Sequence, residues 1–157
     1  MKFAVGLASL PISLLTCIMN IPRLLLSIVA VTVFLSLFQW LYHGGLIADL
    51  YAATPDAWRP MEEMQSLMKF MPLCYLMIAT GFALAWAMVT GGDRKGLAKG
   101  ALFGLVMFVF AFGGQLLGAI FQSFPRSILP WSALGGVIEL VLAGLIVAAV
   151  YRPKPTA

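Results

Sequence analysis

Residues 130–151, PWSALGGVIELVLAGLIVAAVY, decide the fold of this chain. An α-helix needs about 20 apolar residues to cross a hydrocarbon core of roughly 30 Å, and this stretch meets that requirement. Pro130 stands at its start, where a missing backbone N–H costs nothing because the first turn of a helix leaves its N–H groups unpaired. Three further stretches, residues 24–43, 71–90 and 101–121, are similarly long and apolar. The sequence therefore predicts an all-α membrane protein with four transmembrane helices in an up-down bundle.

The composition agrees with a location in lipid. Of the 157 residues, 62% are hydrophobic and 10% are charged, whereas soluble domains carry about 25% charged residues. So few charged side chains are unable to cover a surface that faces water. Cys17 and Cys74 lie within apolar stretches and form no C-x-x-C pair. Neither a disulfide framework nor a zinc site is therefore expected.

The basic residues distinguish the two sides of the predicted bundle. Seven precede the first helix, join the second helix to the third, or follow the fourth: Lys2, Arg23, Arg94, Lys95, Lys99, Arg152 and Lys154. The other side, residues 44–70 and 122–129, has three basic and four acidic residues. Because Lys and Arg are enriched in cytoplasmic loops, this arrangement predicts that both termini are cytoplasmic. Aromatic residues typical of the membrane interface gather toward the other, outer boundary, at Trp40, Tyr42, Trp58 and Trp131.

The chain is predicted to form one transmembrane domain, residues 24–153, followed by a short tail, residues 154–157. Before it, residues 1–23 combine a lysine with an apolar run, which also fits a signal peptide or a fifth span. A good cleavage site is lacking, and Pro11 interrupts the run. Met19, followed by Asn20-Ile21-Pro22-Arg23, is a candidate for an alternative translation start. We expect an interfacial extension on the cytoplasmic side.

The longest connection, residues 44–70, is the most polar part of the chain. Pro60 precedes Glu62 and Glu63, and acidic residues in a first turn favour the start of a helix. Methionines then recur at helical spacing, at Met61, Met64, Met68 and Met71. We predict a short amphipathic helix that lies at the outer interface and leads into the second span.

The methionines raise the possibility of copper chemistry, because thioethers bind Cu(I). Met64-x-x-x-Met68 with a later G-x-x-x-G is similar to the pattern of high-affinity copper transporters. Those proteins have three spans and closer spacing between the two motifs. Methionine also commonly fills apolar helix faces, so Cu(I) handling at Met61, Met64 and Met68 is the least favoured hypothesis.

Five glycines in and just before the third predicted helix have a spacing typical of helix packing in lipid. Gly96, Gly100 and Gly104 form a G-x-x-x-G-x-x-x-G run, which Gly114 and Gly118 extend. Small residues at this spacing let two helix backbones approach closely. We predict that these glycines pack against another helix, in the same chain or in a second copy. A flexible or gating helix is the alternative.

Glu139 is an acidic residue far from either end of a predicted span. At 1.5 Å per residue it lies about 14 Å from Pro130, near the middle of the hydrocarbon core. Burying a carboxylate at this depth costs free energy, and such a residue usually faces the interior of the bundle. An acidic residue inside the membrane is therefore treated first as a candidate functional residue. We predict a polar cavity formed by Glu139, Gln115, His43 and Gln39, with Gln115 as a candidate hydrogen-bond partner of Glu139. Interhelical hydrogen bonding and proton- or cation-coupled function are equally favoured explanations.

Familiar catalytic and cofactor sites have little support. His43 is the single histidine of the chain, so a haem with two axial histidines is excluded, whereas a His/Met pair stays open. His43 fits a hydrogen-bonding anchor better than a ligand. A hydrolytic triad would lack a serine elbow or a cysteine nucleophile motif. No phosphate-binding loop, dinucleotide fingerprint or metalloprotease motif occurs, and nothing indicates nucleic-acid binding. The sequence predicts a protein that is not an enzyme and has no catalytic residue, cofactor or metal.

Several motifs together resemble a family of small, uncharacterised four-helix bacterial membrane proteins. They are His43-Gly44, Asp49, Tyr51, Trp58-Arg59-Pro60-Met61, the glycines of the third span, and Tyr151-Arg152-Pro153. The resemblance covers about residues 24–153. It implies four spans in a bacterial inner membrane, marks Asp49, Tyr51, Trp58 and Arg59 as an outer-loop motif, and implies no activity.

Two main hypotheses for function follow from these features. The first is a non-enzymatic accessory or interaction component of the membrane, whose partners are the lipid bilayer and either a second copy or a membrane complex. The alternative is a small transporter or channel with Glu139 in a polar cavity.

Overall fold

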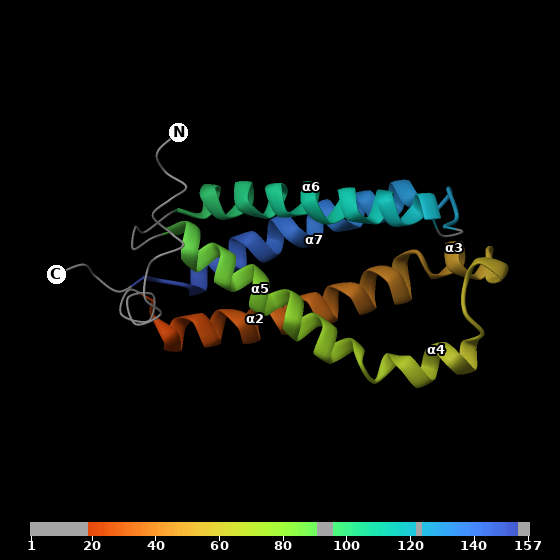
Figure 1. Cartoon of the computed structure of the whole chain (residues 1–157), viewed down its shortest axis with the longest axis horizontal. Helices are drawn as coiled ribbons and strands as arrows, with labels where there is room; N and C mark the ends of the chain where they lie inside the picture. Colours follow the sequence, from red (N-terminus) through yellow and green to blue (C-terminus); the bar gives the residue numbers. More distant parts are fainter. Residues whose placement is uncertain (1–18, 91–95, 122–123, 154–157) are drawn as a thin grey trace.

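The computed structural model describes residues 19–90, 96–121 and 124–153. Four helices in these ranges are long and apolar enough to cross a membrane, and the chain is an all-α, multipass membrane protein (Figure 1). Most of the expected extension, the tail 154–157, and the basic residues Arg94 and Lys95 lie outside the described residues.

The described elements follow one another without strands. In chain order they are α2 (Ile21–Leu41), the π-helical turn η1 (Tyr42–Leu46), α3 (Ala48–Ala52), the 3-10 turn η2 (Pro55–Ala57), α4 (Met61–Met68), α5 (Met71–Thr90), α6 (Leu97–Phe121) and α7 (Leu129–Val150). The four long helices alternate in direction, as an up-down bundle does (Figure 1).

The spans predicted from hydropathy differ from the observed helices at their ends. The first begins earlier than residue 24 because Asn20 caps it: the Asn20 side chain accepts a hydrogen bond of 3.4 Å from the backbone N–H of Arg23. The same span extends to Leu46 through the π-helical turn. In that turn the N–H of Ile47 donates to the carbonyl of Tyr42 over 3.0 Å, the i to i+5 pattern of a π-helix.

The bundle has two ends that differ in structure. We call the end formed by residues 42–70 and 124–128 the loop end, and the end where α2 begins and α7 finishes the termini end (Figure 1). At the termini end the Asn20 amide donates to the carbonyl of Arg152 over 3.0 Å, joining the start of α2 to the finish of α7.

The hydrophobic core lies in the half of the bundle nearer the termini end. α2 packs against α5 and α7, while α6 packs mainly against α7. The core side chains come from α2 (Leu24, Ile28, Val31, Leu35), from α5 (Ala79, Phe82, Ala83, Trp86, Ala87) and from α7 and its end (Ala143, Val147, Tyr151). In α5 the buried residues begin at Ala79, and residues 71–78 are exposed or half-buried. The first half of α5 diverges from α6 and α7 (Figure 1), and a cavity that Tyr75 and Ile78 line leaves this loop half of the bundle open.

Three glycines bring the backbones of α6 and α7 into contact. A Cβ added at Gly104 would lie 2.1 Å from the carbonyl oxygen of Leu140, and one added at Gly144 would lie 2.1 Å from the carbonyl oxygen of Gly100. Both distances are far below van der Waals contact, so a larger residue would force the helices apart. This is the close approach that small residues allow in lipid.

The other glycines of the predicted stripe have no such neighbour. A Cβ added at Gly96, Gly114 or Gly118 would have no described atom of another helix within 4 Å. Of the predicted glycines, Gly100 and Gly104 therefore pack within the chain, and packing of the others against a second copy stays a prediction. At 3.6 residues per turn, Gly114 falls roughly 80° around the helix from Gly104 and leaves the face that meets α7.

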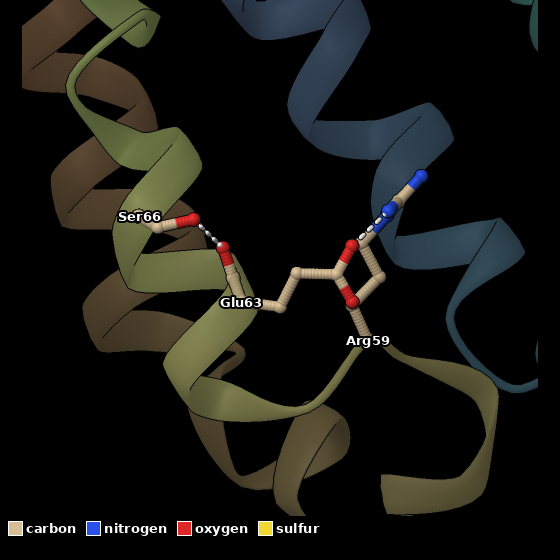
Figure 2. A network of polar contacts seen from close by, with 3 residues as sticks. All are labelled: Arg59, Glu63 and Ser66. Atoms are coloured by element: carbon tan, nitrogen blue, oxygen red, sulfur yellow. Dashed lines mark hydrogen bonds and ion pairs between the residues drawn. The ribbon is translucent and has the colours of Figure 1, made fainter.

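The short helix predicted in the long loop is α4, and all of its residues are exposed or half-buried. Arg59, just before the helix, forms an ion pair with Glu63 in its first turn, and the Ser66 hydroxyl donates to the Glu63 carbonyl over 2.7 Å (Figure 2). Exposed ion pairs of this kind add little stability. For the site described below, this ion pair means that the positive charge of Arg59 lies next to the carboxylate of Glu63.

The α6–α7 contact gives a matched test within one helix. Gly104→Ala should lower the free energy of unfolding by about 1–3 kcal/mol, because the added methyl meets the α7 backbone. Gly113→Ala should be neutral or stabilise by up to about 1 kcal/mol, because alanine favours helix and no described atom lies within 4 Å of its Cβ. Thermal unfolding in detergent measures both, and equal effects of the two changes would contradict the close contact.

Candidate functional site

Glu139 lies near the middle of α7, with 8% of its surface exposed. The amide nitrogen of Gln39, from α2, donates to both carboxylate oxygens, over 3.0 Å to Oε1 and 2.8 Å to Oε2. A carboxylate has room for about four hydrogen bonds. The Gln39 amide therefore leaves acceptor positions on Glu139 unused.

Glu139 borders a cavity of about 390 Å³ in the open, loop half of the bundle. All four long helices contribute to it, and so do the connections at the loop end. The lining residues are Leu35, Gln39, His43, Tyr51, Trp58, Tyr75, Ile78, Phe108, Ala111, Phe112, Gln115, Phe124, Ser132, Gly136, Glu139 and Leu140. The volume is within the range of about 300–1,000 Å³ that is typical of small-molecule sites.

The cavity has a wall of hydrogen-bonded and stacked rings toward the loop end. Nδ1 of His43, in the π-helical turn, lies 2.6 Å from the hydroxyl of Tyr51 in α3. The Tyr51 ring packs edge-on against Trp58, whose indole N–H donates to the Thr54 hydroxyl over 3.2 Å. Burial raises the pKa of Tyr51, with a smaller contribution from Tyr42, so the Tyr51 hydroxyl keeps its proton.

A second contact fixes α2 against α7 beside the cavity. The hydroxyl of Tyr42 donates to the carbonyl of Trp131 over 2.7 Å. The Tyr42 ring fills the space above Gly135, where an added Cβ would lie 2.4 Å from a ring carbon. This contact holds the two helices that supply Gln39 and Glu139 in a fixed relation.

A larger cavity of about 820 Å³ lies next to the first at the loop end and shares His43, Tyr51 and Trp58 with it. Its lining includes Arg59 and the three methionines considered for copper, Met61, Met64 and Met68. No group of three or more His, Cys, Asp or Glu side chains that would suit a metal ion occurs in the described part of the chain. Asp49 is exposed on α3 and lines neither cavity.

The four residues predicted to form a polar cavity, Glu139, Gln115, His43 and Gln39, line one cavity. The hydrogen-bond partner of Glu139 is Gln39, however, and not Gln115. Both amides lie on the correct faces of their helices, and which one reaches Glu139 depends on how α2 and α6 sit against α7. That arrangement is set by packing between helices and not by the pattern along one helix.

The aromatic lining of the cavity was not recognised in the sequence as part of the site. The rings in question are Tyr75, Phe108, Phe112 and Phe124, together with Tyr51 and Trp58 of the outer-loop motif. A helical pattern would have found two of them. Phe108, Phe112 and Gln115 recur at i, i+4 and i+7, the spacing of residues that share a helix face.

Comparison of the chain with protein-family models, with curated proteins and with solved structures returns no match.

The cavity contains a carboxylate whose hydrogen-bond partner, Gln39, is uncharged, and its histidine, His43, is hydrogen-bonded to Tyr51. None of the described residues that line the Glu139 cavity is Lys or Arg. Arg59, which lies next to Trp58 in the sequence, is paired with Glu63 and lines the second cavity instead. A carboxylate in an apolar interior is costly unless a positive charge or a proton neutralises it. The arrangement can therefore bind a proton or a cation at the Glu139 oxygens.

Single and paired substitutions decide whether Glu139 is structural. Glu139→Leu should leave the free energy of unfolding unchanged or raise it, because the substitution removes a costly carboxylate. Gln39→Leu should lower it by about 1–3 kcal/mol, because Glu139 then loses its amide donor. The double variant should match Glu139→Leu alone.

Thermal unfolding in detergent measures this series. Gln115→Leu is the matched control, because Gln115 lines the same cavity and is not the hydrogen-bond donor to Glu139. If Glu139→Leu destabilised as much as Gln39→Leu, Glu139 would be a structural hydrogen-bonding group.

Proposed function

We propose that this chain is a small multipass transporter that exchanges a proton for a cation at Glu139. The observation that supports the proposal is the cavity in front of a buried carboxylate whose described surroundings supply no Lys or Arg. If Glu139 served only to join helices, its hydrogen bond to Gln39 would be enough, and no cavity beside it would be required. The cavity that Glu139 lines supports access of a solute to the carboxylate.

The exchange follows from the cost of an unpaired charge in an apolar interior. The Glu139 carboxylate is stable there when it holds a proton or when it holds a cation. Both bind the same two oxygens, so binding of one favours release of the other. The other titratable groups that line the cavity are His43, Tyr51 and Tyr75. This role requires binding and release without bond chemistry, so we propose a transporter and not an enzyme.

The packing of α5 supports a cavity that opens and closes. α5 is buried against the bundle from Ala79 onward, while residues 71–78 are exposed or half-buried at the loop end. Helices with few buried contacts over part of their length are the elements that move at low cost. We infer that the first half of α5, which contributes Tyr75 and Ile78 to the cavity, moves during exchange.

We further propose that the protein lies in a bacterial inner membrane with its termini in the cytoplasm. The seven basic residues before, between and after the spans on the termini side support this orientation. The resemblance of His43-Gly44 and Trp58-Arg59-Pro60 to a family of four-helix bacterial membrane proteins supports the location in a bacterial inner membrane. The loop end, and with it the cavity, would then face outward.

Proteoliposomes that enclose a pH-sensitive dye test the exchange. A panel of inorganic and organic cations, added outside under a proton gradient, should include at least one that drives proton movement through the wild-type protein. Glu139→Gln should abolish that movement, because the amide binds neither a proton nor a cation at this position. Cations added to the face that carries the loop end should act, because the cavity lies in that half of the bundle.

The matched control is Glu62→Gln, which removes a carboxylate from exposed α4, keeps the Arg59–Glu63 ion pair and lies outside the cavity lining. It should behave as wild type. If no cation moved protons faster through the wild type than through Glu139→Gln, exchange at Glu139 would be excluded.

A second candidate function is that of an accessory component that associates with a second copy or a membrane partner through α6. The exposure of α6 supports this candidate function. Of the residues in an 18-residue apolar stretch of α6, 6% are buried, compared with 28–33% in the equivalent stretches of the other three spans. Part of α6 also leaves room for another helix. No described atom of another helix lies within 4 Å of a Cβ added at Gly113, Gly114 or Gly118, and small residues let a second helix approach closely.

Native mass spectrometry in detergent tests this association. Gly114→Leu with Gly118→Leu should shift an oligomer toward the monomer, because the larger side chains prevent close approach of a second helix. Gly45→Leu is the control, since Gly45 also has no described neighbour but lies on η1. A monomeric wild type, or an oligomer that the double substitution does not change, would contradict association through this face.

A further inference from the structure

We propose that the cation bound at Glu139 is a small organic ammonium ion, held by the carboxylate and by the aromatic walls of the cavity. The inference rests on the proposed function and names the class of its solute. It follows from the side chains that surround Glu139 and from those that are lacking among the described lining residues.

Aromatic rings from separate parts of the fold enclose the space in front of Glu139. α6 supplies Phe108 and Phe112, which are stacked with centroids 5.2 Å apart. The loop end supplies Tyr51, Trp58 and Phe124, linked edge to face with centroid distances of 4.9 Å and 5.9 Å. α5 supplies Tyr75. The rings therefore border the cavity on more than one side.

Aromatic walls and one carboxylate are the chemistry that recognises a weakly hydrated organic cation. A cation within about 6 Å of a ring centroid is attracted by the ring quadrupole, and quaternary ammonium ligands are commonly bound by several rings together. The alkyl groups of such an ion also favour apolar walls such as Leu35, Ile78 and Leu140. In a cavity of about 390 Å³ an ion of this kind stays close to the rings.

Inorganic cations fit the same cavity poorly. Ca²⁺ requires about six to eight oxygen ligands and Mg²⁺ an octahedral set, usually with more than one carboxylate. Besides one carboxylate, the cavity offers two amides, Gln39 and Gln115, and the hydroxyls of Ser132, Tyr51 and Tyr75. No group of three or more acidic, His or Cys side chains that could hold a metal ion occurs among the described residues. Rings do not replace the hydration shell that a small metal ion would lose on entering.

Anions and neutral solutes are disfavoured by the charge of the cavity. No described lining residue is Lys or Arg, and the guanidinium of Arg59 is paired with Glu63 outside this cavity. An anion would meet the Glu139 carboxylate without compensation. A neutral solute of the same shape would leave that carboxylate unneutralised, or would not displace its proton.

Equilibrium binding to the full-length protein in lipid nanodiscs tests the inference. The probe is radiolabelled choline, a quaternary ammonium ion. The competitor is its neutral isostere, in which carbon replaces the nitrogen. Comparing the two shows how much of the binding depends on the positive charge. Choline should bind saturably, excess unlabelled choline should displace it, and the isostere and Na⁺ or K⁺ at equal concentration should not. Glu139→Gln should abolish the binding.

The aromatic contribution is tested on one helix with a matched pair of substitutions. Phe112→Leu should weaken choline binding by about 2- to 30-fold, because it removes a cation–π partner and keeps an apolar side chain. Phe110→Leu should leave the affinity unchanged, because Phe110 is 79% exposed and does not line the cavity. Elution as a single species in detergent checks that each variant is folded.

The outcomes separate this inference from the proposed function. If Na⁺ or K⁺ drove proton movement that depends on Glu139 while choline neither bound nor drove it, exchange at Glu139 would stand and an organic solute would be excluded. Equal binding of the neutral isostere, no binding of choline, or equal affinities for Phe112→Leu and Phe110→Leu would likewise overturn the inference.

Discussion

A carboxylate in the apolar interior of a helix bundle constrains everything around it. Glu139 is buried near the middle of α7, where water is unable to stabilise its charge as it does at a surface. The protein meets this constraint partly through the Gln39 amide, which donates to both oxygens. An amide supplies a dipole and not a charge, so neutralisation still requires a proton or a cation. The cavity beside Glu139 lets such an ion reach the carboxylate.

The fold separates a rigid half from an open half along the length of the same helices. Near the termini end, glycines let α6 and α7 touch through their backbones, and Trp86 and Phe82 of α5 fill the core against α2. Toward the loop end, α5 diverges and side chains no longer fill the centre. Tyr42 holds α2 to α7 at this end through Trp131. The carboxylate and its amide are therefore fixed in position, while the wall formed by α5 has few buried contacts.

The sequence predicted those features that depend on a single helix. Length and apolarity located the four spans of the described residues, because crossing a bilayer is a requirement on each segment separately. The depth of Glu139 followed from its distance along α7. Three features that depend on the relation between helices were not predicted: the choice of Gln39 over Gln115, the separation of Gly114 from the contact face, and the divergence of α5. These features depend on the crossing angles between helices and on the rotation of each helix about its axis. Side-chain packing between helices sets both, so the sequence pattern of one helix does not predict them.

The central claim is that Glu139 holds an exchangeable proton that a cation displaces. Infrared difference spectroscopy of the protein in lipid measures it most directly, because a protonated carboxyl group has a C=O stretching band that a carboxylate lacks. The claim predicts that adding a bound cation removes a carboxyl band in the wild type, and that Glu139→Gln shows no such change. A band that cation addition leaves unaltered, or the same loss in Glu139→Gln, would contradict the claim.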